Sequence, residues 1–271
     1  MTTGTKSKHR QLAQFLVSVP LLFATAGCSL AGTAARVGEL RTKTESVELT
    51  DAESVQVEIY MAAGELAMSG GATELLRADF TYNVDELEPE VNYGGGTLVV
   101  RTPEASIGAD SFLGLSGYQY RWELQLNETV PMEMRVQVGA GTADLHLGSL
   151  AITRLDIETG ASEVTVDLSG AASLTRLDVE AGVGLVSMDL TGGWQHDLDA
   201  KINSGVGGLT LRLPREVCVR VDVEGGLGSV NAKGLAKEDS VYTNDACDGS
   251  AVTLRIEIDA GIGGVDLEVE G

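Results

Sequence analysis

The sequence predicts an all-β protein built as a β-solenoid, a single domain in which strands stack in rungs of about 21–23 residues. From Val47 onward, apolar and polar residues alternate with the period of two that is typical of β-strands. Glycine occurs 34 times, and aromatic residues make up only 4% of the chain. Val, Leu, Ile and Ala must therefore fill the interior, which favours many thin layers over one thick core.

A glycine recurs after successive alternating segments and defines an internal repeat. Its positions, spaced 21, 22, 23, 21 and 35 residues apart, are Gly139, Gly160, Gly182, Gly205, Gly226 and Gly261. A second small residue follows two positions later, as Gly141, Ser162, Gly184, Gly207, Gly228 and Gly263. An earlier copy has Ala62 and Gly64 in these places. We interpret each Gly-x-Gly as a corner, where the backbone must reach positive φ or approach the neighbouring rung closely.

Apolar residues keep fixed positions relative to each corner. One of them always follows the first glycine, as in Ala140, Val183 and Val206. We expect these apolar columns to face inward and the polar columns to face water, with the rungs stacking in the order of the sequence. No rung can bury its own apolar face, so stacking must supply the stability.

The N-terminus predicts export. Residues 1–27 have the layout of a signal peptide, with Lys6, Lys8 and Arg10 before a short apolar stretch. Small residues then lead to Cys28, which we expect to carry the lipid anchor of a lipoprotein. The alternative is cleavage after Ala26, which would leave a soluble chain with a free Cys28. Residues 28–46 are predicted to be a flexible tether, and residues 47–271 the folded domain.

Two cysteines remain, Cys218 and Cys247. In an oxidising, exported context an even pair predicts a disulfide, and two free thiols are the alternative. Neither cysteine has a His or a second Cys at metal-ligand spacing, so we expect no metal site there.

Charge and motifs narrow the classes of function. Forty acidic residues against nineteen basic ones give a net charge of −21, which disfavours binding to nucleic acid and to anionic lipid surfaces. Outside the signal only His146 and His196 occur, and no catalytic or phosphate-binding motif is present. We therefore expect no enzymatic activity, no cofactor and no metal. A carbohydrate-active solenoid enzyme is the least favoured alternative.

Carboxylates recur on neighbouring rungs. Asp156 should stack on Asp178, and Glu158 on Glu180, close enough to attract a divalent cation. The favoured alternative is a solvated acidic face, relieved by basic residues such as Arg135 and Lys201.

One irregular segment, residues 103–122, breaks the repeat. Its aromatic and basic side chains could bind a glycan or a partner protein by stacking and bidentate contacts, and they are Phe112, Tyr118, Tyr120, Arg121 and Trp122. The favoured alternative is that they cover the flank of the solenoid, where an open edge needs protection.

Several segments in this order resemble the toast-rack family, a domain related to the extracytoplasmic part of LiaF-type cell-envelope stress regulators. The segments are residues 61–71, residues 78–83 leading to Pro89, residues 122–126 before Pro131, the Gly139 rung, Leu213-Pro214 and the closing Gly261-Ile-Gly263. The resemblance runs from about Val47 to Gly271. It implies an all-β rack of strands in the cell envelope, with no catalytic residues.

Taken together, the sequence predicts a non-enzymatic, lipid-anchored envelope protein whose solenoid is an interaction or structural module. Its expected partners are the membrane, through the anchor, and envelope proteins or glycans. An accessory sensor for an envelope-stress system is the alternative.

Overall fold

The computed structural model describes residues 37–49, 52–103 and 116–270, so Cys28 and Phe112 lie outside the described residues. This part of the chain is all-β and forms one large sheet. Its strands are β1 (Arg41–Val47), β2 (Val55–Ala72), β3 (Leu76–Tyr82), β4 (Glu90–Gly94), β5 (Thr97–Arg101), β6 (Tyr120–Asn127), β7 (Met132–His146), β8 (Ile152–Asp167), β9 (Arg176–Asp189), β10 (Leu198–Pro214), β11 (Cys218–Leu227), β12 (Val230–Lys233), β13 (Ala236–Glu238), β14 (Val241–Thr243), β15 (Thr253–Ile262) and β16 (Val265–Glu270). Two short 3-10 turns, η1 (Asp85–Leu87) and η3 (Asp245–Asp248), join them. No helix within these ranges is long and apolar enough to cross a membrane.

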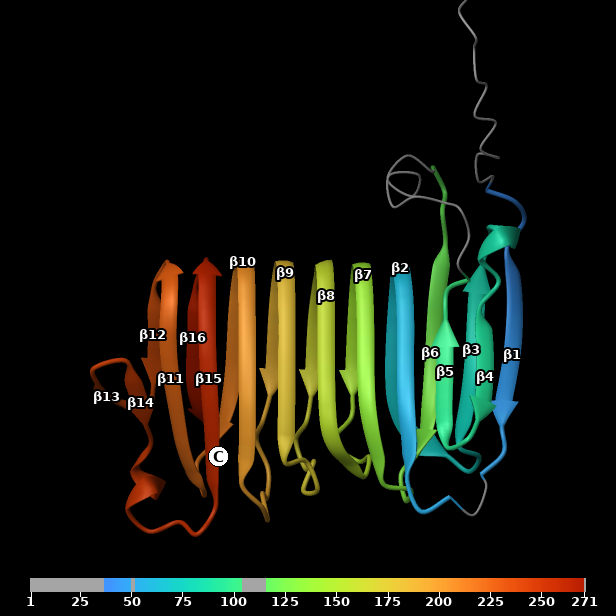
Figure 1. Cartoon of the computed structure of the whole chain (residues 1–271). Helices are drawn as coiled ribbons and strands as arrows, with labels where there is room; N and C mark the ends of the chain where they lie inside the picture. The colour runs from blue at the N-terminus through green and yellow to red at the C-terminus, as the bar shows by residue number, and fades with distance from the viewer. Residues whose placement is uncertain (1–36, 50–51, 104–115, 271) are drawn as a thin grey trace, which may run out of the picture. The chain divides into compact units, whose positions relative to one another are not determined.

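The centre of the sheet is parallel. Strands β2, β7, β8, β9 and β10 pair side by side in register, and β15 with β16 continues the stack (Figure 1). Beyond them lie β11, which pairs with β15, and β12, which pairs with β16. Antiparallel strands extend the sheet at both ends of this parallel block, beyond β6 at one end and beyond β11 at the other.

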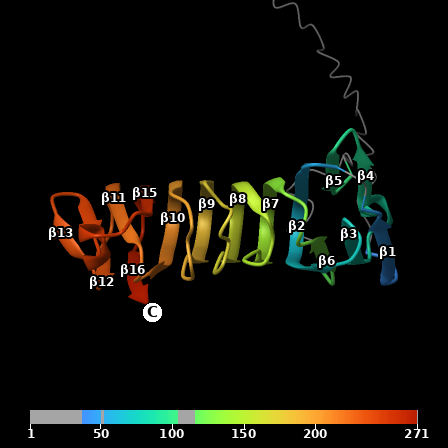
Figure 2. The same ribbon diagram turned by 90° about the horizontal axis from the view of Figure 1, so that it is seen from below.

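Each long strand doubles back on itself. Strand β7 has 15 residues, and only residues 147–151 link it to its parallel neighbour β8. A straight strand of that length would span roughly 50 Å, whereas five linking residues reach at most about 18 Å. The burial pattern shows where the direction changes, because Met134 and Val136 are buried before the glycines and Ala143 and Leu145 after them. The halves before the glycines therefore form a first layer, and the halves after the glycines form a second layer that faces it (Figure 2).

The core consists of apolar columns between the two layers. One column of the second layer contains buried residues from six strands, namely Leu66, Ala143, Val164, Val186, Leu209 and Val265. A matching column of the first layer contains Ile59, Val136, Ile157, Val179, Ile202 and Ile258. Each strand therefore depends on its neighbours in the stack to bury its apolar side chains.

The expected stacking order is wrong at the C-terminal end. Strand β15 lies between β10 and β11, so the Gly261 rung follows the Gly205 rung and precedes the Gly226 rung. The physical reason is the 35-residue interval before Gly261. Over that interval the chain leaves the stack, forms β13 and β14 at its end, and returns to fill the vacant place.

The predicted tether, residues 28–46, includes residues that belong to the folded sheet. Arg41–Val47 forms strand β1, which pairs antiparallel with β3 over its whole length. Ion pairs fix this edge, including Arg41 with Asp85 at 2.9 Å and Lys43 with Glu88 at 2.9 Å. The polar composition of residues 41–46 resembles a linker, but it equally suits an edge strand with one face in water.

Candidate interaction surface at the corner of the strand stack

Two glycine columns lie where the long strands change direction. At Gly139, Gly160, Gly182, Gly205 and Gly261, an added Cβ would collide with a backbone oxygen of the preceding strand in the stack. The second column has positive φ, for example +146° at Gly207, and contains Gly64, Gly141, Gly184, Gly207 and Gly263. In β11, which lies beyond β15 in the stack, Gly226 has a φ of +89°. A Cβ on Gly228, just after β11, would collide with Gly263 O. Close backbone approach and positive φ both require glycine here.

The residue between the two glycines faces solvent. This corner row is in register across seven strands and consists of Ala63, Ala140, Ala161, Val183, Val206, Ile262 and Leu227. The row was expected to face inward, and that expectation is wrong, because a side chain at the outside of a bend points away from both layers. Three small alanines occupy one half of the row, and four branched aliphatic residues occupy the half nearest the C-terminal end.

One neighbour widens the aliphatic half of the row. Leu185, in the second layer, is also exposed. We define the apolar corner patch as Val183, Leu185, Val206, Ile262 and Leu227, with exposed fractions from 46% for Val206 to 78% for Leu227. Single exposed aliphatic residues are ordinary, whereas a contiguous set on one surface is typical of an interaction site. The signal in the sequence was the change from Ala to Val, Ile and Leu between the glycines.

A groove runs beside the corner row on the first-layer side. It has a volume of about 880 Å³, and the first glycine column forms part of its lining. Glu180, Asn203 and Asp259, which are in register on neighbouring strands, also line it. The apolar corner patch therefore borders a strip of acidic and amide side chains.

Arginines bridge the predicted acidic columns. Asp156 and Asp178 are in register, and Arg154 lies within 3.1 Å of the first and 3.2 Å of the second. Arg176 adds a contact of 2.9 Å to Asp178. Hydrogen bonding to Asp156 raises the pKa of the Arg154 guanidinium. Arg135 and Gln137 contact Glu158, so Asp156, Asp178 and Glu158 already have basic or amide partners on the chain itself.

The described aromatic and basic residues of the irregular segment 103–122 differ in exposure. Tyr120 and Trp122 are almost fully buried, and Trp122 packs edge-on against Phe80 with ring centroids 5.5 Å apart. Burial argues against the binding role considered for these two side chains and agrees with the favoured alternative, because the inward positions of β6 cover the N-terminal end of the core. Tyr118 donates a hydrogen bond to Ala63 O at 2.8 Å, and burial raises the pKa of its hydroxyl. Arg121 pairs with Glu123 at 3.0 Å.

Tyr118 and Arg121 nevertheless border a cavity. Its volume is about 1130 Å³, and its lining includes Ala63 and Ala140 of the corner row. These two side chains are the described members of the predicted binding segment that remain accessible to a ligand.

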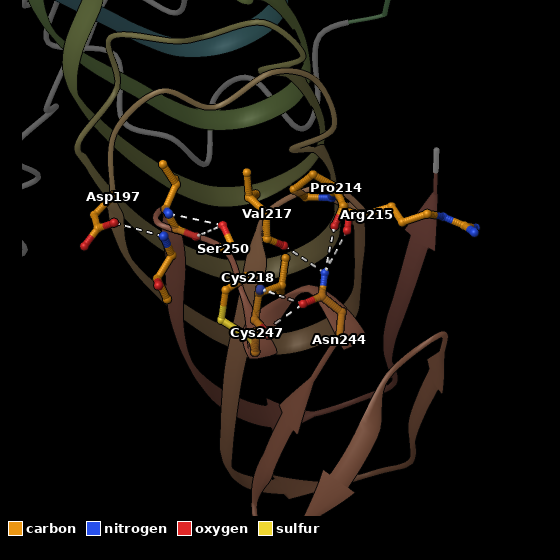
Figure 3. The surroundings of a disulfide bond; sticks show 11 residues. Asp197, Pro214, Arg215, Val217, Cys218, Asn244, Cys247 and Ser250 are labelled. Carbon is orange, nitrogen blue, oxygen red and sulfur yellow. Dashed lines mark hydrogen bonds between the residues drawn. A yellow bond between two sulfur atoms is a disulfide. The ribbon is translucent and has the colours of Figure 1, made fainter.

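The predicted disulfide is present and belongs to the C-terminal closure. Cys218 at the start of β11 is bonded to Cys247 in η3 (Figure 3). Beside it, the buried amide of Asn244 accepts from Val219 N at 3.0 Å and donates to Val217 O at 2.9 Å. Nothing in the sequence singles out Asn244, since only the fold brings it to the turn between β10 and β11.

These features define a class of protein, an all-β rack of in-register parallel strands flanked by antiparallel strands. The chain belongs to the toast-rack family. The family model "N-terminal domain of toast_rack, DUF2154" matches residues 36–173 and 170–212.

One solved structure shares this fold, and a second gives a weaker match. A "putative cell adhesion protein" from Clostridium sporogenes is 24% identical, with a TM-score of 0.63 over 86% of this chain and 100% of that one. A "putative adhesin" from Parabacteroides distasonis is 11% identical, with a TM-score of 0.34 over 84% and 97%. No curated protein matches the chain.

Proposed function

We propose that this protein is a non-enzymatic, lipid-anchored component of the cell envelope that binds a partner through the apolar corner patch. The patch carries the proposal. It places Val183, Val206, Ile262 and Leu227 in one solvent-exposed row, although the same strands bury most of their other aliphatic side chains. Cell adhesion, the role for which the Clostridium sporogenes protein is named, is a function of this kind, and this analogy rests on the shared fold alone.

The corner patch follows from a β-solenoid whose rungs of about 21–23 residues turn at Gly-x-Gly. Such a turn leaves one side chain per rung outside both layers. Identical spacing of the rungs then aligns these side chains into a straight row, at about 4.8 Å per rung. The arrangement suits an extended contact with another polypeptide better than a contact with a small molecule.

The anchor is proposed at Cys28, which lies outside the described residues. Intact-mass analysis of the protein from its membrane fraction tests it. We expect a chain that begins at Cys28 and carries diacylglyceryl, and a Cys28→Ser variant that leaves the membrane fraction. A soluble wild-type chain that begins at Gly27 would contradict the anchor.

Photo-crosslinking in intact cells tests the interaction. A photoreactive residue replaces Val206 or Ile262 in the patch, or Thr165 on the exposed outer face of the second layer as a matched control. We expect both patch positions to give the same discrete adduct, and Thr165 to give none. Equal labelling at Thr165 would show that the patch has no specific partner.

A further inference from the structure

The two layers of the sheet end differently at the C-terminal end of the stack. In the first layer, β14 and then β13 continue the sheet beyond β11. In the second layer, β12 is the last strand, and it pairs with β16 alone. The first layer therefore overhangs the second by two strands, or roughly 10 Å.

Strand β12 leaves the apolar columns of the second layer uncovered at their C-terminal end. Val230 is in register with Val265 and continues a column in which the other members, from Leu66 to Val265, are at most 5% exposed. Val230 itself is 38% exposed, because no strand of the described chain covers it on the far side. Ala232 continues the neighbouring column of Leu211 and Leu267 and is partly exposed in the same way.

The backbone of β12 is open at the same place. Ser229 O accepts a hydrogen bond from Val265 N at 2.9 Å. Residues of a parallel ladder alternate between groups that face the partner and groups that face away. The N–H and C=O groups of Val230 and Ala232 therefore point away from β16, toward the vacant side.

The other three edges of the described sheet carry charged side chains. Strand β1 has Arg41, Lys43 and Glu45, β13 has Lys237 and Glu238, and β4 begins with Glu90. Charged side chains are a usual protection of an edge against pairing. Strand β12 is also short and ends with Lys233, but this lysine is paired with Glu268 on β16, and the inward positions of β12 are the apolar Val230 and Ala232.

We propose that β12 accepts an extended segment of another polypeptide, which adds a parallel or antiparallel strand to the second layer beneath the β14–β13 overhang. The inference rests on the proposed interaction function and gives its recognition mode. The outward side chains of β12 are already engaged, Asn231 with Asp266 at 3.2 Å and Lys233 with Glu268 at 2.9 Å. Recognition therefore uses the free backbone groups and apolar side chains at alternate positions of the added strand.

In the anchored form proposed above, which begins at Cys28, segments of the same chain cannot reach this place. Gly38 is fixed to the N-terminal closure by a hydrogen bond from its N–H to Asn83 O at 2.7 Å. The ten residues from Cys28 to Val37 span at most about 35 Å. Nine strand intervals separate β1 from β12 through the second layer, or roughly 43 Å. Residues 104–115 join β5 to β6 at that same distant end.

A second copy fits poorly. Antiparallel pairing of two β12 strands has a two-fold axis perpendicular to the sheet, which would bring both β14–β13 overhangs onto the same side, where they collide. Stacking β1 of another copy on β12 would set Lys43 and Glu45 against the open apolar columns. The net charge of −21 also repels a second copy and favours a neutral or basic segment.

Peptide binding to the full mature protein tests the proposal. The probe is a labelled synthetic peptide with the sequence of residues 208–213, Gly-Leu-Thr-Leu-Arg-Leu, whose leucines occupy the same columns in β10. A peptide of the same composition with adjacent leucines is the control. Ala232→Pro removes one outward N–H and leaves the bonds to β16 intact, since an edge strand tolerates proline on its open side. Ala232→Val, which keeps that N–H, is the matched variant.

We expect saturable binding that Ala232→Pro weakens at least tenfold and Ala232→Val leaves within about threefold. Hydrogen exchange should show slowed amides at Val230 and Ala232 when the peptide is bound. Equal binding by the proline variant, absence of binding, or a dimer that protects these amides without peptide would each overturn strand addition. Crosslinking at Val206 that persists in any of those cases would leave the proposed interaction function standing.

Discussion

Gly261 lies directly beside Gly205 in the parallel ladder of β10 and β15, although residues 206–260 separate them in the sequence. A Cβ on Gly261 would collide with Gly205 O, and a Cβ on Gly205 would collide with Gly182 O. The corner thus depends on a series of close contacts, each between a glycine and the backbone of the next strand.

Gly205→Val should therefore unfold the protein at much lower denaturant concentration. The side chain would push two strands of the stack apart, and we expect a loss of about 3 kcal/mol or more in the free energy of unfolding. Gly193→Ala is the control, because nothing lies within 4 Å of a Cβ at Gly193. Urea denaturation followed by circular dichroism measures both, and similar losses in the two variants would refute the argument.

Ser162 occupies the place of a second-column glycine, and its hydroxyl is buried without a hydrogen-bond partner in the described structure. Removing a buried, unpaired polar group is neutral or stabilising. We expect Ser162→Ala to leave the free energy of unfolding unchanged or raise it by about 1 kcal/mol. The exposed Thr165→Ala change serves as the reference. A clear loss of stability at Ser162 would mean that its hydroxyl has a bonding partner.

The Cys218–Cys247 bond closes a loop with a sequence separation of 29 residues. Replacing both cysteines by alanine should lower the free energy of unfolding by about 3 kcal/mol, because the unfolded chain gains freedom. Reductant should destabilise the wild type by a similar amount and leave the double variant unaffected. Equal stability with and without reductant would contradict a structural role for the bond.

Trp122→Ala tests whether the aromatic segment closes the core or binds a ligand. Because Trp122 is fully buried against Phe80, we expect a loss of about 3–5 kcal/mol in unfolding free energy. Arg121→Ala, on the exposed side of the same strand, should cost less than about 1 kcal/mol. A Trp122 variant as stable as the Arg121 variant would restore this tryptophan as a candidate binding residue.

Asp197 should make the stability of the fold sensitive to acid, because its carboxylate contacts β15, the strand with which the chain re-enters the stack. Its carboxylate accepts from Thr253 N at 2.9 Å and pairs with Arg255 at 2.9 Å, and these contacts hold the pKa of Asp197 below its usual range. A depressed pKa gives stability that is present above the unfolded-state value, 3.8, and is lost as the pH falls through the folded-state value. NMR titration should place the pKa of Asp197 below 3.8, and Asp197→Asn should remove this part of the acid dependence. A pKa at or above that unfolded-state value would rule the linkage out.

Some elements could be predicted because they depend on local rules. Two glycine positions per rung, the inward columns such as Val136 with Ile157, and the Cys218–Cys247 pair all follow from spacing and residue type. Other elements depend on neighbours remote in sequence. Arg154 bridges Asp156 and Asp178 only because β8 and β9 stack in register, and β1 is a strand only because β3 offers it an edge.

By itself, the sequence determined that this chain is all-β, repetitive and strongly acidic, since alternation and glycine spacing are local properties of the backbone. The tertiary structure decided which apolar residues remain outside. A corner row such as Val206 and Ile262 resembles a core column in sequence, and only the bend turns it toward solvent. The structure likewise decided that β15 enters between β10 and β11 and that β12 ends the second layer uncovered, because pairing partners are chosen by available edges.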